Sequence, residues 1–392
     1  MTDALPDFEN TEIAFKHLSD SDLLRAWTLF RAINVKPLVS VGPPLVTLSL
    51  KLRLPVKGLL KSTIFNHFCG GETLESCSET MARLAKSKVS SILDYGIEGE
   101  KTEHGFDAAE KELLRTVAFT AKNPNVPFCV FKMTALARFG LLEDLSGQLM
   151  RHQTPTTSDE SLRVLRRVES ICSAAVASGK LVMIDAEETW IQPAIDQIAL
   201  EMMRKHNRDQ CRVYTTIQMY RSDGLTLVKN LIHTAQSEGW KCGIKLVRGA
   251  YMEKERERAG KHGYPSPIHP DKDATDNAYN AALDMILRSP NSSLCAGTHN
   301  TESSRLALEL ARSSGLAPKD PKVWFAQLLG MSDDLTFNIA NSGYNAAKYV
   351  PYGPVDAVLP YLFRRARENT SIAGQSGREL LLIEKEIRRR RH

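Results

Sequence analysis

The sequence predicts an α/β barrel of parallel strands, because two kinds of segment alternate along it. About eight short apolar runs recur, and each is followed by enough sequence for an amphipathic helix. This alternation is typical of a parallel sheet, and a count near eight favours a closed barrel over the alternative, an open doubly wound sheet. The predicted strands are Val89 to Tyr95, Phe128 to Thr134, Leu181 to Asp185, Val213 to Tyr220, Cys242 to Val247, Leu294 to His299, Val323 to Leu329 and Ala347 to Val350.

The length of 392 residues is enough for one barrel of roughly 250 residues with additions. We expect residues 1–80 to form a helical arm, with a Pro-rich passage at Pro43 and Pro44, and residues 81–392 to form the barrel domain. Periodicity and capping residues predict helices at Ser21 to Ile33, Asp107 to Thr120, Asp159 to Ser178 and Asp273 to Arg288.

The composition argues against several classes of protein. With 42% hydrophobic and 25% charged residues the chain reads as globular, and no apolar run approaches the ~20 residues of a membrane span. The net charge of +5 comes partly from Arg388 to Arg391, expected to be a solvated helix end, so no nucleic acid partner is expected. Seven scattered cysteines without a CxxC pair indicate a reducing compartment, and His262 and His269 lack metal-ligand spacing, so no metal is expected.

Polar residues end nearly every predicted strand. In a barrel of this kind the chemistry lies at the carboxyl ends of the strands, so these side chains are candidates for a site. Two lysines and an arginine among them indicate an anionic ligand or cofactor, although Asp185 and Glu187 are alternative ion partners for these bases. The set comprises Asp94, Lys132, Asp185 with Glu187, Gln218, Lys245 with Arg248, His299 with Asn300, Gln327 and Tyr349.

A second candidate lies in the helix expected after the last strand, which we expect to be the last helix. Tyr361, Arg364, Arg365 and Glu368 follow the spacing i, i+3, i+4, i+7, which places them on one helix face with Glu368 one turn beyond Arg364. Two guanidinium groups beside an aromatic ring can clamp a small carboxylate. A surface ion-paired helix is the alternative, but the turn from Tyr349 to Pro354 is expected to carry this helix across the barrel mouth.

Dispersed motifs then suggest a family. They are Lys245-Leu246-Val247-Arg248-Gly249-Ala250-Tyr251, Asp185-Ala186-Glu187, Gly297-Thr298-His299-Asn300, Gln327-Leu328-Leu329-Gly330-Met331, and Tyr361-Leu362-Phe363-Arg364-Arg365 with Glu368. From about Ser62 to Leu382 the chain resembles the proline dehydrogenase family, and from Tyr349 to Ser371 it resembles the animal mitochondrial branch.

This resemblance implies a distorted (β/α)8 barrel with a C-terminal helix over its mouth and a bound FAD. It implies oxidation of L-proline to Δ1-pyrroline-5-carboxylate by hydride transfer from ring C5 to flavin N5, with electrons passed to ubiquinone. The carboxylate would be bound by Arg364, Arg365 and Lys132, the ring enclosed by Tyr349, Tyr361 and Leu328, the arginines oriented by Glu368, and the pocket supported by Tyr251 and Asp185. The flavin would contact Lys245, Gln218, Arg248, Gly249, Ala250, His299 and Asn300.

Two departures from the family stand out. Many bacterial members have arginine where this chain has Lys245, so a bidentate contact becomes a point-charge contact. Mitochondrial relatives tend to carry a longer insertion where this chain has the short loop from Gln153 to Ser158. The resemblance implies the mitochondrial matrix with peripheral contact to the inner membrane, although the acidic N-terminus shows no presequence. A bacterial cytoplasm at the inner membrane is the alternative.

Two other functions remain open. A Schiff-base aldolase-type barrel would use Lys132 or Lys245 as the nucleophile. A non-catalytic barrel would bind an anionic partner through its basic C-terminal helix.

Overall fold

The structure is a computed structural model that describes residues 5–35, 46, 52, 56–96, 100–371 and 375–391. At residues 59, 366–371, 375 and 376 it describes the backbone alone. The expected Pro-rich passage at Pro43 and Pro44 and the side chain of Glu368 therefore lie outside the described part. The chain divides into two compact units, one of residues 1–96 with 327–392 and one of residues 97–326.

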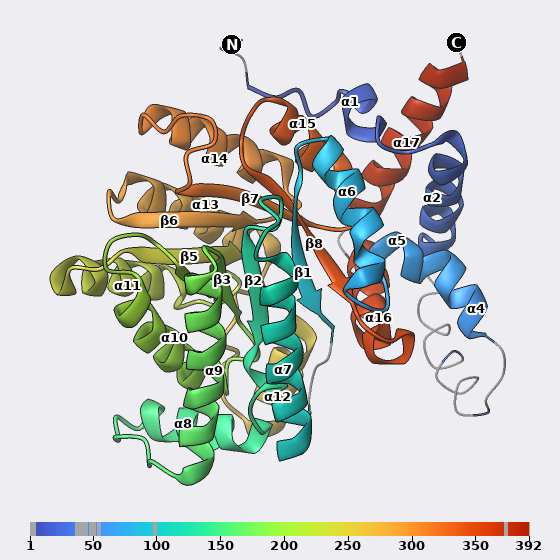
Figure 1. Ribbon diagram of the computed structural model, residues 1–392. Coiled ribbons are helices and arrows are strands. Elements are labelled where there is room, and N and C mark those ends of the chain that lie inside the picture. Colours follow the sequence, from blue (N-terminus) through green and yellow to red (C-terminus); the bar gives the residue numbers. More distant parts are fainter. Residues whose placement is uncertain are drawn as a thin grey trace. The chain divides into compact units, whose positions relative to one another are not determined.

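Eight parallel strands close into a barrel in the order of the sequence (Figure 1). This confirms the closed barrel and excludes the open doubly wound sheet. Each strand falls on a predicted apolar run, although β6 begins two residues earlier than expected and β8 continues through Tyr352. The strands are β1 Ser90–Tyr95, β2 Phe128–Lys132, β3 Leu181–Asp185, β4 Val213–Gln218, β5 Cys242–Val247, β6 Ser292–Gly297, β7 Val323–Leu328 and β8 Ala346–Tyr352.

Aromatic rings fill the interior of the barrel near the start of its strands. The ring centre of Phe128 on β2 lies 5.7 Å from that of Tyr214 on β4 and 5.2 Å from that of Trp324 on β7, and both pairs pack edge to face. These strands are not neighbours, so all three side chains point inward. Because side chains alternate along a strand, the inward face of β2 continues to Lys132 and that of β4 to Gln218.

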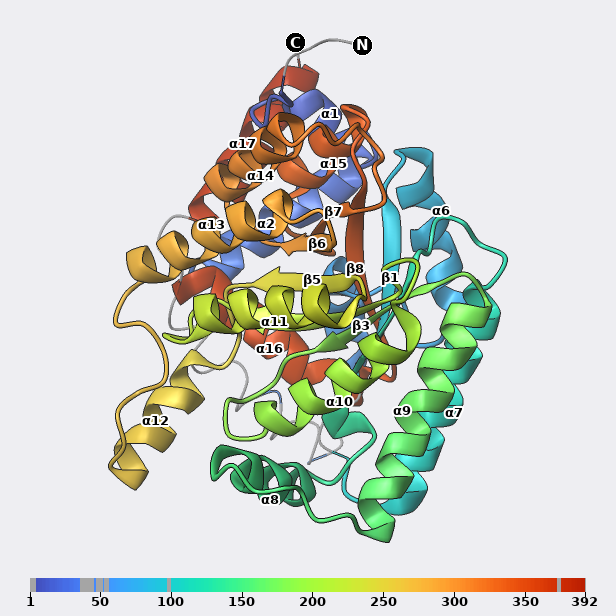
Figure 2. The same ribbon diagram turned by 90° about the vertical axis from the view of Figure 1, so that its left-hand side faces the viewer.

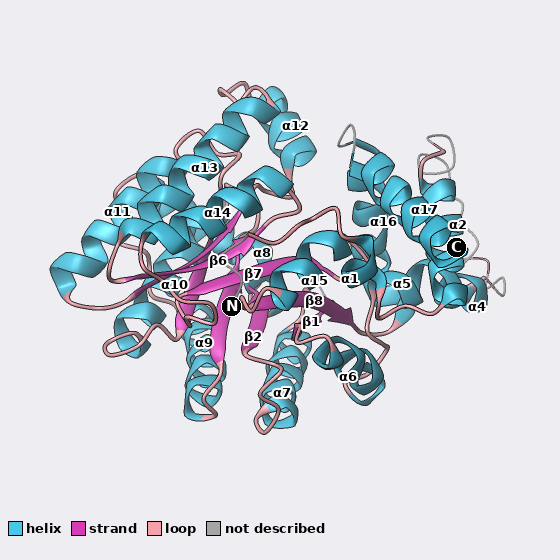
Figure 3. Cartoon of the chain, turned by 90° about the horizontal axis from the view of Figure 1, so that it is seen from above, coloured by secondary structure: helices cyan, strands magenta, loops and turns pink. Residues whose placement is uncertain are grey.

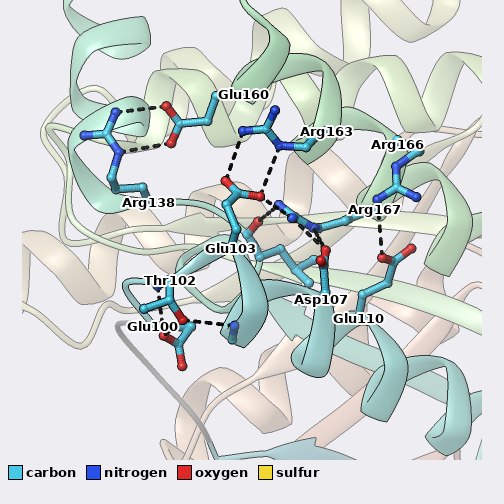
Figure 4. Close-up of polar contacts among 12 residues, drawn as sticks. Glu100, Thr102, Glu103, Asp107, Glu110, Arg138, Glu160, Arg163, Arg166 and Arg167 are labelled. Atoms are coloured by element: carbon cyan, nitrogen blue, oxygen red, sulfur yellow. Dashed lines mark hydrogen bonds and ion pairs between the residues drawn. The ribbon is translucent and has the colours of Figure 1, made fainter.

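Helices follow the strands of the unit formed by residues 97–326. Helices α7 and α9 lie side by side (Figure 2). Arg167 of α9 is fully buried and joins the two helices through Asp107 at 2.7 Å and Glu103 at 2.5 Å (Figure 4). It also donates to the carbonyl of Leu136 at 3.2 Å. The helices are α7 Glu103–Thr120, α8 Phe139–Met150, α9 Asp159–Ala177, α10 Gln192–His206, α11 Gly224–Glu238, α12 Met252–His262, α13 Lys272–Arg288 and α14 Thr301–Ser313.

The other unit holds β1, β8 and helices from both ends of the chain. Helix α2 lies beside α17 (Figure 3), and Trp27 Nε1 donates to Glu384 at 3.1 Å. The helix that carries Tyr361 was expected to be the last, which is wrong, because α17 follows it. The α-helices are α1 Thr11–Phe15, α2 Asp20–Ile33, α4 Lys57–Leu60, α5 Asn66–Phe68, α6 Ser78–Lys86, α15 Asp333–Asn341, α16 Val355–Ser371 and α17 Gln375–Arg391.

Among the residues that the structure describes, no helix is both long enough and apolar enough to cross a membrane. Nor do these residues contain a group of three or more His, Cys, Asp or Glu side chains placed to hold a metal ion. All seven cysteines are free thiols, and most of them are buried.

Candidate active site

The carboxyl ends of β2, β3 and β5 bring two lysines to one carboxylate. Lys132 and Asp185 are register partners on β2 and β3, and their Nζ and Oδ2 atoms lie 3.5 Å apart. Lys245 on β5 donates to the other oxygen of Asp185 over 2.6 Å. Burial raises the pKa of Asp185, but Lys245 and Lys132 outweigh it and hold that pKa below its ordinary range. Two lysine side chains thus contact the carboxylate of Asp185 at the ends of these strands.

Glu187, two residues beyond Asp185, has a different role from its neighbour. Its carboxylate accepts from the backbone N–H of Thr134 at 2.9 Å and from the Thr134 hydroxyl at 2.5 Å. Its own backbone carbonyl accepts from Gln218 Nε2 at 2.7 Å. Burial raises the pKa of Glu187 to about 7. Glu187 therefore links the turn after β2 to the end of β4.

The turn after β5 requires glycine at Gly249. Its φ is +130°, and a Cβ atom there would lie 2.6 Å from the ring of Tyr220. The next backbone N–H, that of Ala250, points to Oε1 of Gln218 at 3.4 Å. Tyr251 is buried at the start of α12, with Lys254 Nζ over its ring at 5.4 Å. The turn after β5 thus places Gly249 and Ala250 beside the side chain of Gln218.

Arg248 is held by residues from two helices. It pairs with Asp276 of α13 at 2.6 Å and donates to Thr298 Oγ1 at 2.6 Å and Ser303 Oγ at 2.9 Å. Asn300 caps α14 by accepting from the backbone N–H of Ser303 at 2.9 Å. Arg248, His299 and Asn300 therefore belong to one region of this unit. Sequence reasoning did not identify Asp276 and Ser303 as partners of Arg248, because both lie inside amphipathic helices.

In the other unit, α16 carries the aromatic and arginine side chains. The guanidinium carbon of Arg365 lies 5.2 Å from the ring centre of Tyr361, as the i, i+4 spacing led us to expect. Both side chains are buried, as is Tyr349 on β8, whereas Arg364 is partly buried. Tyr361 and Leu328 belong to one hydrophobic cluster with Met331. The contact expected between Glu368 and Arg364 stays a prediction, because the Glu368 side chain is not described.

Sequence reasoning missed the buried charge of Lys348. Lys348 lies on β8 beside Tyr349, is fully buried, and pairs with Asp333 at 2.7 Å. A lysine inside an otherwise apolar strand was the available signal, but its partner is the first residue of α15 and is not adjacent in sequence.

A model of the family described as "Proline dehydrogenase" matches residues 77–378. The carbapenem antibiotics biosynthesis protein CarD of Pectobacterium carotovorum is 36% identical over 336 residues, 85% of this chain and 86% of CarD. Human mitochondrial proline dehydrogenase 1 is 41% identical over 252 residues, 62% of this chain and 42% of the human protein.

The fold has counterparts among solved structures. Proline utilization A of Bdellovibrio bacteriovorus, inactivated by N-propargylglycine, superposes with a TM-score of 0.71 at 19% identity, covering 93% of this chain. The matched part is only 37% of that larger chain. Because the family model spans most of the sequence, the chain belongs to the proline dehydrogenase family.

Proposed function

We propose that this chain oxidises L-proline to Δ1-pyrroline-5-carboxylate with bound FAD, the first step of proline catabolism. Membership of the family supports the reaction. The observation that supports it most directly is that Lys132 and Lys245 come together on the carboxylate of Asp185 at the carboxyl ends of three strands. Ammonium groups are hydrogen-bond donors and carry positive charge, so these strand ends suit ligands that carry negative charge or accept hydrogen bonds.

The residues at these strand ends fit a flavin by their chemistry. Lys245 and Gln218 offer hydrogen-bond donors, and the turn at Gly249 brings the backbone of Ala250 to Gln218. FAD, when bound, supplies a two-electron acceptor for the hydride that leaves ring C5 of proline. We assign its binding to Lys245, Gln218, Arg248, Gly249, Ala250, His299 and Asn300.

The residues of α16 are assigned to the substrate. Arg364 and Arg365, with Lys132, would bind the proline carboxylate, and Glu368 would orient the arginines. Tyr349, Tyr361 and Leu328 would enclose the ring, while Tyr251 and Asp185 support the pocket. Holding the carboxylate fixes how the ring lies, and positioning of this kind lowers a barrier by several kcal/mol. The amine proton leaves to solvent or is lost before binding in this scheme.

We further propose that ubiquinone accepts the electrons and that the protein works in the mitochondrial matrix, with peripheral contact to the inner membrane. The names of the animal and plant relatives support the mitochondrial assignment. The similarity to CarD of Pectobacterium keeps the bacterial cytoplasm at the inner membrane as the alternative.

The rival aldolase mechanism is disfavoured by the same ion pairs. An ammonium group paired with a carboxylate has no lone pair with which to attack a carbonyl, and Asp185 engages both Lys132 and Lys245. Inactivation by borohydride in the presence of a carbonyl substrate would revive that mechanism.

The experiment is turnover of a substrate panel with a dye as electron acceptor, followed by mass spectrometry of the product. L-proline should lose two hydrogens to give a cyclic imine, whereas D-proline and acyclic amino acids should react far more slowly. Equal rates across the panel, or no turnover of L-proline, would overturn the proposed function.

A further inference from the structure

The loop between β7 and α15 has an unusual backbone. Gly330 has a φ of +76°, and a Cβ atom there would lie 2.5 Å from the carbonyl oxygen of His67. Ser332 has a φ of +50° although it is not glycine, a conformation that costs roughly 1 kcal/mol or more. Such a loop keeps its shape only where surrounding groups hold it. It begins at Leu328, which the proposed function assigns to the wall around the proline ring.

Lys348 is the centre of the contacts that hold this loop. Its Nζ atom donates to the carbonyl of Met331, approaches the carbonyl of Leu328 at 3.4 Å, and pairs with Oδ1 of Asp333 at 2.7 Å. The lysine thus contacts both ends of the loop and a carbonyl within it. One ammonium group has three protons, and these three acceptors match that number.

Other side chains complete the support. His67 Nε2 lies 2.9 Å from the carbonyl oxygen of Gly330, and Glu379 of α17 accepts from the backbone N–H of Ser332. His17, just after α1, lies 3.4 Å from the second oxygen of Asp333 and stacks on Phe337. The helices at both ends of the chain therefore converge on this loop.

The cost of burying Lys348 indicates that its contacts matter. A charged ammonium group taken out of water costs several kcal/mol unless it is paired and hydrogen-bonded. The neighbouring Ala346, Ala347 and Val350 show that apolar side chains fit this strand. Burial raises the pKa of Asp333, but Lys348 and His17 outweigh it and hold that pKa well below its ordinary range. Lys348 is therefore a buried charge whose hydrogen bonds go to the Leu328 loop.

We propose that Lys348 is a positioning residue for substrate binding, acting through the carbonyls of Leu328 and Met331 to set the loop that fits the proline ring. This inference rests on the proposed function, because Leu328 has its role only there. Lys348 does not touch substrate in this account. Its loss should therefore weaken the fit of the ring and leave the flavin in place.

The test uses a double variant that carries Lys348→Met and Asp333→Asn, so that both charges are removed together. This double variant is compared with the wild-type chain. The KM for proline should rise about tenfold while kcat changes less than about threefold, with flavin content unchanged. The ratio of kcat/KM for proline to kcat/KM for its six-membered homologue, piperidine-2-carboxylate, should decrease. Where this double variant does not fold, Lys348→Gln, which keeps a donor for Met331, takes its place. It too should raise the KM for proline with little change in kcat.

Lys180 offers a matched control. It is also a buried lysine and donates to two backbone carbonyls, those of Asn123 at 2.7 Å and Val126 at 2.8 Å, in the other unit. Lys180→Met should lower the melting temperature and leave the KM for proline unchanged. A rise in KM for this control equal to that of the Lys348 variant would overturn the proposal, since general destabilisation would then account for both.

A double-mutant cycle with Leu328→Ala separates this inference from the proposed function. If Lys348 acts through Leu328, adding Lys348→Met and Asp333→Asn to Leu328→Ala should raise the KM for proline little further. If the effects are independent, the fold-increases in KM should multiply. Multiplying effects, or a wild-type KM in a folded Lys348 variant, would overturn the inference alone. No proline turnover by the wild-type chain would overturn the proposed function and this inference with it.

Discussion

Lys245 donates to Oδ1 of Asp185 over 2.6 Å, and Nζ of Lys132 lies 3.5 Å from Oδ2 of the same carboxylate. Asp185→Asn leaves both lysines buried without that counter-charge. Breaking a buried ion pair in this way costs about 3–5 kcal/mol, so urea denaturation should show a loss of that size. Glu143→Gln, which breaks the more exposed pair with Arg258, should cost below about 1 kcal/mol. Equal losses in the two variants would contradict the shared-carboxylate account.

Arg364→Ala and Arg365→Ala should each raise the KM for proline and leave flavin content intact. A charge-assisted contact to a carboxylate contributes roughly 1.5–3 kcal/mol, which is on the order of a hundredfold in kcat/KM. Steady-state kinetics with the absorbance ratio of flavin to protein measures both effects. Arg388→Ala, at the exposed end of α17, is the control. Wild-type kcat/KM in both α16 variants would mean that this helix face does not bind substrate.

Tyr349 should decide between proline and trans-4-hydroxyproline. The resemblance implies that its ring lies over C4 of the substrate, where a hydroxyl group would need room. The wild-type chain should prefer proline, and Tyr349→Ser should shift the ratio of kcat/KM by about 1–3 kcal/mol toward hydroxyproline. An unchanged ratio would remove Tyr349 from the substrate site.

Glu187 should make stability fall as the pH rises. Burial raises its pKa in the folded chain to about 7 from an ordinary 4.5, so its contribution is full below the lower value and is lost as the pH passes the higher one. Between about pH 5 and about pH 8, the free energy of unfolding should fall less in Glu187→Gln than in the wild type, by at most about 3 kcal/mol. Glu201→Gln, which changes a partly buried carboxylate elsewhere in that unit, should keep the wild-type slope. The same slope in Glu187→Gln and wild type would contradict this assignment.

The strands were predictable because buried parallel strands appear as short apolar runs, and Leu181–Asp185 and Cys242–Val247 match the structure residue for residue. The Arg365 and Tyr361 contact followed from helical spacing alone. Lys348 and Asp333 were missed because their pairing depends on how β8 lies against the start of α15, which no local pattern encodes. The different roles of Asp185 and Glu187 also escaped prediction, since a two-residue spacing does not reveal that the turn after β2 supplies Thr134.

The central claim is that the chain binds a flavin that L-proline reduces, and anaerobic visible spectroscopy tests it most directly. The purified protein, reconstituted with FAD if needed, should show the flavin absorption bands, and L-proline should bleach them without added NAD. Protein in which Arg364 and Arg365 are both alanine should keep the bands and bleach only at far higher proline concentrations. A protein that takes up no flavin, or a bound flavin that L-proline leaves oxidised, would contradict the account.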